Sequence, residues 1–207
     1  MEIGAAITAF VALFVIIDPV GLTPVFVALT RGQSTAERRG IALRACAIAV
    51  GLLTIFGLLG EAVLDFIGIS MPAFRISGGI LLFITALDML FERRTQRREG
   101  QSIGPEEDPS VFPLAMPLIA GPGAMATMIL LAGQAGGDPL YLLMVHLVML
   151  AVVALVFGLF LTAGPFERAL GHTGVIVVTR LLGMLLAALS VQFVLDGLRD
   201  FGVVSGG

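Results

Sequence analysis

The residue whose chemistry stands out is Asp18, because it directly follows an apolar run at residues 3–17. A helix rises about 1.5 Å per residue, so this carboxyl group would lie about 20 Å into the run. An ionised carboxylate at that depth in a membrane is costly unless it is paired or hydrated. Asp18 is therefore a candidate ligand or proton carrier. It is equally suited to cap a helix that begins at Pro19, and one residue can do both.

Prolines and glycines interrupt the apolar sequence at two places, which predicts two broken helices. Proline removes an amide donor and glycine tolerates unwound geometry, so backbone groups are left without helical partners. Free amides at a half-helix N-terminus suit a carboxylate, and free carbonyls suit an ammonium group or a cation. Two such breaks predict a site for a zwitterion, although prolines can also be kinks that neighbouring helices repair. The candidate binding residues are Asp18, Pro19, Gly21, Thr23 and Pro24 in the first break, and Ala120, Gly121, Pro122, Gly123 and Thr127 in the second.

The two breaks also indicate an internal repeat. Pro19 and Pro122 are 103 residues apart, and Arg75 and Arg180, each at the start of a similar motif, are 105 residues apart. Both separations are close to half of the 207-residue chain. With three membrane crossings in each copy, the second copy enters the membrane in the opposite sense, so the repeats are inverted. Inverted repeats with a broken helix in each are typical of secondary transporters.

Two of the expected helices carry charges that oppose their own dipole. Arg75 and Arg180 open these helices, and Asp88 and Asp196 lie near their ends. If the helices are antiparallel, Arg75 shares one side of the membrane with Asp196. Arg180 then shares the other side with Asp88, which predicts two ion pairs that act as gates. Gln192 could line the same pathway or bond to a neighbouring helix. The alternative is that the four charges reach headgroups or water.

Several kinds of chemistry lack their usual residues. Cys46 is the single cysteine, and His146 and His172 are each unaccompanied, so neither a metal site nor a cofactor is expected. The chain has no HExxH pattern, one tyrosine and no ATP-binding motif, so it is not expected to be an enzyme. A formal net charge of −3 with no lysine offers no basic face to nucleic acid.

The composition indicates which solvent surrounds these residues. Of the 207 residues, 57% are hydrophobic and only 13% are charged, and the mean hydropathy is +1.03. A water-facing surface needs more polar residues than this, so the expected solvent is lipid. A bilayer core takes about 20 apolar helical residues, and backbone groups in lipid must be paired internally, which favours helices. The predicted fold class is all-α integral membrane, with six transmembrane helices at residues 3–29, 41–68, 72–91, 111–133, 139–163 and 174–197.

A single membrane domain is expected at residues 1–207, with repeat one at 1–91, a linker at 92–110 and repeat two at 111–207. Most arginines lie in the first, third and fifth connections, and cytoplasmic loops are rich in arginine. The linker is therefore predicted to be cytoplasmic, with the N- and C-termini outside. Glycine-rich helix faces leave a homo-oligomer open.

Four motifs together resemble the MarC family of membrane proteins, and the likeness covers nearly the whole chain. The motifs lie at residues 18–26, 75–82, 117–124 and 191–197. The resemblance implies a small neutral amino acid transporter of the LysE-like exporter superfamily in the bacterial cytoplasmic membrane. It further implies export or exchange of glycine, alanine or serine, with a proton or sodium as the coupling ion.

The expected function is secondary transport by alternating access, with the substrate held between the two breaks. One alternative is a small-solute channel, which would need a continuous wet path and would not show saturable counterflow. Another is a membrane protein without transport activity that is linked to a stress or antibiotic response, which would need no symmetric breaks.

Overall fold

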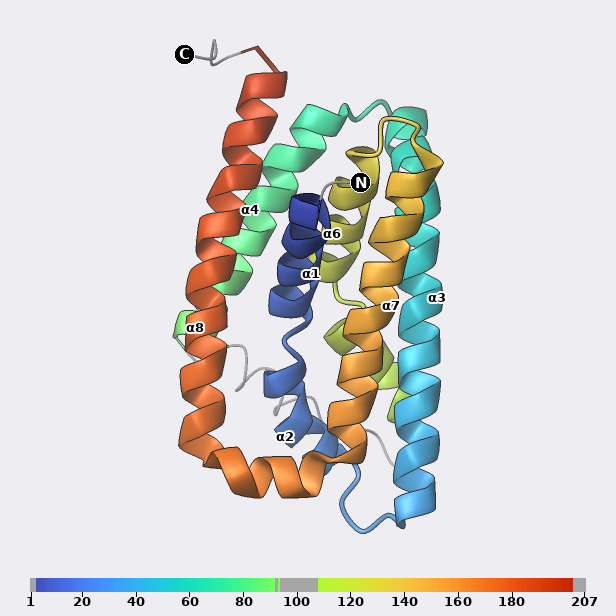
Figure 1. Ribbon diagram of the computed structural model, residues 1–207, viewed down its shortest axis with the longest axis vertical. Coiled ribbons are helices and arrows are strands. Elements are labelled where there is room, and N and C mark those ends of the chain that lie inside the picture. Colours follow the sequence, from blue (N-terminus) through green and yellow to red (C-terminus); the bar gives the residue numbers. More distant parts are fainter. Residues whose placement is uncertain (1–2, 92, 94–107, 203–207) are drawn as a thin grey trace.

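A computed structural model describes residues 3–91, 93 and 108–202, and every regular element in these ranges is a helix (Figure 1). The all-α prediction is therefore confirmed for this part of the chain. The predicted linker at 92–110 falls mostly outside the described residues. In chain order the helices are α1 (Ile3–Ile17), α2 (Pro19–Leu29), α3 (Thr35–Ile67), α4 (Met71–Leu90), the π-helix η1 (Ser110–Ile119), α6 (Pro122–Gly133), α7 (Pro139–Leu161) and α8 (Ala163–Asp200).

Local sequence signals explain where the outer helices begin. At the start of α3, Ser34 accepts a hydrogen bond from the Glu37 amide while the Glu37 carboxylate accepts one from the Ser34 amide, which forms a capping box. α4 begins after Ser70, whose side chain accepts a hydrogen bond from Ala73 N. α7 begins after Asp138, which is followed by proline at the first helical position. These caps satisfy amides that a helix leaves unpaired in its first turn.

Among the described residues, five helical segments are long and apolar enough to cross a membrane. A sixth span results when η1 and α6, which form a pair bent by 53°, are counted together. The second segment begins at Thr35, earlier than the predicted start at residue 41, because the Ser34 cap adds polar turns to the helix. α8 begins well before the predicted residue 174 and changes direction at Gly171, where φ is 64°. The five segments are Ile3–Leu29, Thr35–Ile67, Met71–Leu90, Pro139–Leu161 and Ala169–Asp200.

The described chain crosses the bundle repeatedly between an upper and a lower end (Figure 1). α1 and α2 descend, α3 ascends and α4 descends; then η1 and α6 ascend, α7 descends and α8 ascends. The start of α1 and the end of α8 therefore lie toward the upper end. α1 packs against α6, α7 and α8, and α6 also packs against α3 and α4. The two segments with interruptions thus lie inside the bundle.

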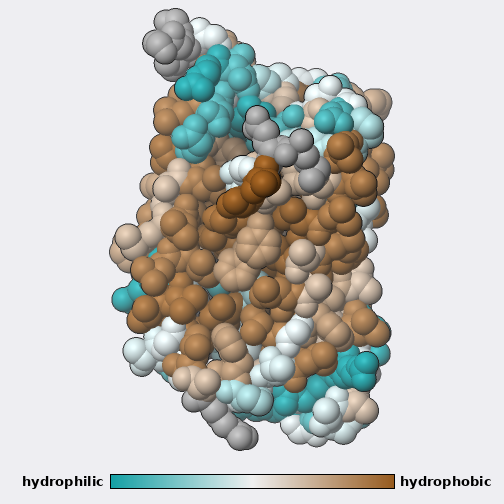
Figure 2. Space-filling view, in the orientation of Figure 1, coloured by the Kyte–Doolittle hydropathy of each residue, from teal (hydrophilic) through white to brown (hydrophobic). Residues whose placement is uncertain are grey.

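Glycines allow α4 and α8 to pack closely along their length. A Cβ atom on Gly79 would lie 2.8 Å from the Ser190 carbonyl oxygen, and one on Gly183 would lie 3.3 Å from the Ala86 carbonyl oxygen. Close backbone approach of this kind is how helices associate in lipid, where the hydrophobic effect does not drive them together. Figure 2 shows hydrophobic residues across the middle of the molecule and hydrophilic residues gathered at its two ends, as a membrane-spanning bundle requires.

Candidate functional site

The first span is interrupted at Asp18, which adopts the left-handed conformation with φ 56° and ψ 65°. Its Oδ1 atom accepts a hydrogen bond from Gly21 N at 3.0 Å, so the carboxylate caps α2. The residue is fully buried. Position 21 must be glycine, because a Cβ atom there would lie 2.2 Å from Asp18 Oδ2. Capping is thus an observed role of Asp18, while ligand binding and proton transfer stay predictions.

The fourth span is interrupted between η1 and α6. Ala120 has φ −92° and ψ 61°, outside helical geometry, and α6 then begins at Pro122. Gly121 lies against the preceding turn, since a Cβ atom on it would be 2.4 Å from the Pro117 carbonyl oxygen. The N-cap residue of α6 is Gly121, which has no side chain that could accept from the amides of the first turn.

Contacts at Gly123 bring the two interruptions together. A Cβ atom on Gly123 would lie 2.8 Å from Ile16 Cδ1, two residues before Asp18, and 3.5 Å from Leu82 Cδ2 of α4. Since α2 runs downward from Pro19 and α6 runs upward from Pro122, the N-terminal ends of both half-helices lie near the middle of the bundle (Figure 1). Two positive helix ends and a buried carboxylate thus occupy one region.

The remaining predicted binding residues differ in their surroundings. The Thr23 hydroxyl donates to the Pro19 carbonyl at 2.9 Å, and the Thr127 hydroxyl donates to the Gly123 carbonyl at 2.8 Å; both side chains are buried. Pro24 lies inside α2, whereas Pro122 is exposed and does not line an enclosed site. The two threonines therefore bond back to the preceding turn of their own helices, as hydroxyl side chains inside helices commonly do.

The predicted ion pair between Arg75 and Asp196 is wrong, because Arg75 instead contacts Asp200. The register of the two helices gives the reason: Gly197 packs against α4, and Asp200, three residues later, lies on the same face of α8. Asp196 accepts a hydrogen bond from Gln192 Nε2 at 2.9 Å and lies 3.9 Å from Arg199. The ion pair between Arg75 and Asp200 is well placed for an electrostatic role, since the Arg75 side chain is only 14% exposed.

The second predicted pair, Arg180 with Asp88, stays a prediction. Asp88 is partly buried near the end of α4, and Arg180 is exposed on α8. Both residues take part in interactions in the structure.

An ion pair that the sequence did not reveal lies at the lower end of the bundle. Arg44 of α3 has its Nη2 atom 3.4 Å from Asp108 Oδ2, and its Nε donates to Ser110 Oγ at 3.2 Å. Hydrogen bonds from the Ser110 amide and hydroxyl, and secondarily the Arg44 charge, hold the pKa of Asp108 below its usual value. Both side chains are about half exposed, so the pair alone contributes little stability.

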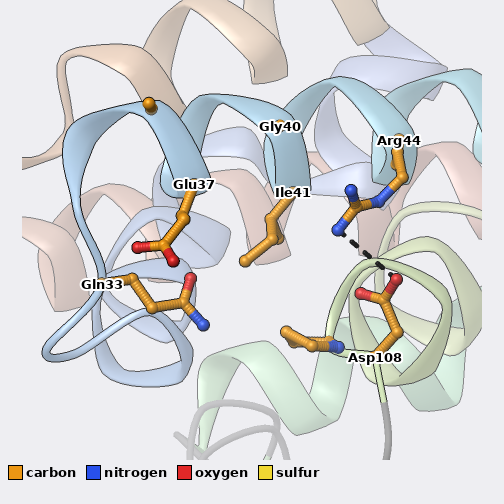
Figure 3. A pocket seen from close by; sticks show the side chains of 8 residues that line it. Gln33, Glu37, Gly40, Ile41, Arg44 and Asp108 are labelled. Atoms are coloured by element: carbon orange, nitrogen blue, oxygen red, sulfur yellow. Dashed lines mark ion pairs between the residues drawn. The ribbon is translucent and has the colours of Figure 1, made fainter.

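This pair forms one wall of a polar pocket of about 540 Å³ (Figure 3). Figure 3 shows Gln33 and Glu37 pointing toward one another across the pocket from Asp108. The signal in the sequence was an arginine inside a predicted span, but its partner could not be identified without the fold. The pocket is lined by Gln33, Ala36, Glu37, Gly40, Ile41, Arg44, Asp108 and Pro109.

Metal-ligating residues are not clustered in the part of the chain that the structure describes, which holds no group of three or more His, Cys, Asp or Glu side chains able to share an ion. His146 uses its Nδ1 atom in a contact of 2.8 Å with the Leu142 carbonyl oxygen. Cys46 is buried.

Comparison with known proteins agrees with this architecture. The model of a family described as MarC family integral membrane protein matches residues 3–201. A UPF0056 membrane protein of Archaeoglobus fulgidus is 40% identical over 195 residues, which cover 93% of this chain and 91% of the relative. The UPF0056 inner membrane protein YhgN of Escherichia coli K12 is 36% identical over 195 residues, covering 93% and 95% of the two chains. No solved structure matches the chain.

Proposed function

Because this chain belongs to the MarC family of integral membrane proteins, we propose that it is a secondary transporter of small neutral amino acids such as glycine, alanine or serine. The observation that carries the proposal is the convergence of two half-helix N-termini inside an apolar bundle. α2 and α6 both begin at a proline in the interior of a span, and the contact between Gly123 and Ile16 joins the two regions. A bundle with a purely structural role needs no such interruptions.

The arrangement provides complementary groups for a zwitterion. The first turn of α6, which has glycine as its N-cap residue, presents amides toward a carboxylate, and the helix dipole favours negative charge there. The buried carboxylate of Asp18, which caps α2, supplies the negative charge that would attract an ammonium group. Ile16 and Leu82 pack directly on Gly123, which leaves little room for a large substrate side chain. These features favour a small amino acid over a long one.

Matched contacts support the inverted repeat on which this proposal depends. The Gly79 position contacts Ser190 O and Val194 N, and the Gly183 position contacts Ala86 O and Leu90 N. The three residues of the first half that take part in these contacts each have a counterpart 104 residues later: Gly79 with Gly183, Ala86 with Ser190, and Leu90 with Val194. The same separation relates Thr23 to Thr127, which make the same hydrogen bond four residues back. One pseudo-two-fold relation accounts for both sets of contacts.

Two ion pairs at opposite ends of the bundle suit alternating access. Arg75–Asp200 joins α4 of the first half to α8 of the second at the upper end. Arg44–Asp108 joins α3 of the first half to the segment before η1 at the lower end. Because each pair crosses between halves, breaking one while the other holds would open the central region to one side at a time. We therefore assign these pairs the gating role that the sequence suggested for other partners.

The orientation of the bundle follows from its charges. Arg31, Arg38 and Arg39 lie around the connection between α2 and α3 at the lower end. The positive-inside rule then makes the lower end cytoplasmic and both termini external. A reporter fused after Gly207 that is active only outside the cytoplasm tests this orientation, and activity of a cytoplasmic reporter contradicts it.

Uptake into proteoliposomes tests the proposed function. Labelled glycine, alanine and serine are expected to accumulate saturably, whereas lysine, glutamate and phenylalanine are not. Asp18→Asn is expected to keep the cap but change the rate or its pH dependence. Asp138→Asn is the matched control, because Asp138 also caps a helix before a proline but lies exposed at the start of α7. Equal flux in protein-containing and empty liposomes, with folded protein, would contradict the proposal.

A further inference from the structure

The first turns of α3 and α8 enclose a small cavity at the lower end of the bundle, separate from the two interruptions. Its volume is about 190 Å³. A water molecule takes about 30 Å³, so about six waters would fit, and a phosphate group with its four oxygens fits as well. The lining residues are Thr35, Arg38 and Arg39 of α3, Phe160 and Leu161 of α7, and Ala163, Gly164 and Pro165 of α8.

The cavity carries positive charge, and no carboxylate is found among its described lining residues. Among the described residues, no carboxylate forms an ion pair with Arg38 or Arg39. The neighbouring acid, Glu37, lies on another face of α3, where Ser34 holds it and where it lines the 540 Å³ pocket (Figure 3). Arg38 is held in place by the Phe26 ring, whose centroid lies 5.5 Å from its guanidinium carbon. Phe26 is in turn stacked on Phe160, with ring centroids 4.3 Å apart.

The walls of the cavity place it at the boundary between apolar and polar layers. Arg38 and Arg39 come directly before the buried apolar residues of α3, which begin at Ile41. On the opposite wall α7 ends at Leu161, whose side chain is 49% exposed, and the chain then turns into the first part of α8 across the lower end (Figure 1). A charged cavity beside an exposed leucine therefore lies where a lipid headgroup meets its acyl chains.

We propose that this cavity binds the phosphate of an anionic phospholipid headgroup, with Arg38 and Arg39 as its ligands and Leu161 against the acyl chain. Arginine guanidinium groups match phosphate oxygens in geometry and charge. Basic pockets between transmembrane helices on the cytoplasmic side are suited to such headgroups. The inference does not depend on the transported substrate, because none of the lining residues belongs to the two interruptions.

Native mass spectrometry of the protein released from detergent tests the site. Wild-type protein titrated with dioleoyl phosphatidylglycerol is expected to retain it more tightly than dioleoyl phosphatidylcholine. Each arginine near a membrane surface contributes enough to change anionic lipid affinity about fivefold. Arg38→Gln/Arg39→Gln should therefore weaken phosphatidylglycerol binding about 25-fold. The matched control is Arg31→Gln, which removes an exposed arginine of the connection just before α3 and should change the affinity by less than about twofold.

A single variant guards against misfolding, since Arg38 also contacts Phe26. Arg39→Gln leaves that contact in place and should lose about fivefold in affinity. Equal retention of the two lipids by wild type, or equal losses in the double variant and its control, would overturn the proposal. Inorganic phosphate identifies the source of the ligand: if millimolar phosphate raises the melting temperature of the wild type as much as phosphatidylglycerol does, the lipid assignment is overturned.

Discussion

The cap that Asp18 provides to α2 can be separated from its charge by three substitutions at this one position. Asp18→Asn keeps an oxygen that accepts the Gly21 amide, and asparagine tolerates the left-handed conformation at φ 56°. Asp18→Gly tolerates the conformation but loses the side-chain oxygen. Asp18→Ala loses both the hydrogen bond and the conformational tolerance.

The expected losses of stability follow from these differences. Replacing an N-cap residue by alanine costs about 0.5–2 kcal/mol, and a left-handed alanine adds about 1–2 kcal/mol, so Asp18→Ala should lose about 1.5–4 kcal/mol. Glycine at a cap costs only a few tenths of a kcal/mol relative to the natural residue. Asp18→Asn should match or exceed the wild type, because it also removes a carboxylate that is fully buried at membrane depth.

Thermal unfolding in a mild detergent, followed by circular dichroism, measures the order of the variants. The expected order is asparagine, then glycine, then alanine. Asp138→Ala is the matched comparison, because that cap has an ordinary φ of −75° and its loss removes only the hydrogen bond to Leu140 N. If Asp18→Ala were as stable as Asp18→Asn, the cap and the strained backbone at position 18 would not hold the interruption, and the reasoning would be refuted.

Three further predictions follow from the packing and the ion pairs. Gly183→Val should weaken the α4–α8 interface and lower the melting temperature, because its Cβ would meet backbone atoms of α4; a melting temperature equal to that of the wild type contradicts this. Arg75→Gln and Asp200→Asn should slow transport singly, whereas a double-mutant cycle should show coupling between them; additive effects would exclude a direct pair. The pKa of Asp108 is lowered in the folded state, so its stabilising contribution is present above the usual carboxyl pKa and is lost as the pH falls through the lowered value. Comparing Asp108→Asn with wild type across pH 2–6 should show a stability difference that shrinks toward acid pH, and a constant difference would contradict it.

The helical fold could be predicted because lipid removes most alternatives. Long apolar runs must be helical when no water is available to pair the backbone, so hydropathy alone located most span ends to within a few residues. The largest differences are at ends that polar caps extend, such as Thr35, and at the bent start of α8 near Gly171. Such ends lie in water or headgroups, where hydropathy gives no boundary.

The start of the first half-helix was also readable in the sequence. α2 begins at Pro19, because proline fits the first helical position, where no amide partner is needed, and α6 begins at Pro122 for the same reason. The register between α4 and α8 could not be predicted from the sequence. The partner of Arg75 depends on which face of α8 meets α4, and that face is set by Gly197 and its neighbours rather than by distance along the sequence.

The lower ion pair was missed for a different reason. Arg44 lies inside an apolar span, where its charge signals a partner but not which one, and Asp108 lies in a segment with several other acids. Only the fold shows that the beginning of η1 packs beside α3.

Counterflow of labelled alanine in proteoliposomes tests the central claim most directly. Vesicles preloaded with unlabelled alanine should take up label transiently above the equilibrium level, and the overshoot should saturate with external alanine. The same overshoot should appear with glycine and serine preloads but not with lysine. Label that only equilibrates with first-order kinetics at every concentration, from protein shown to be folded, would indicate a channel or an inert bundle and would contradict alternating access between the two half-helices.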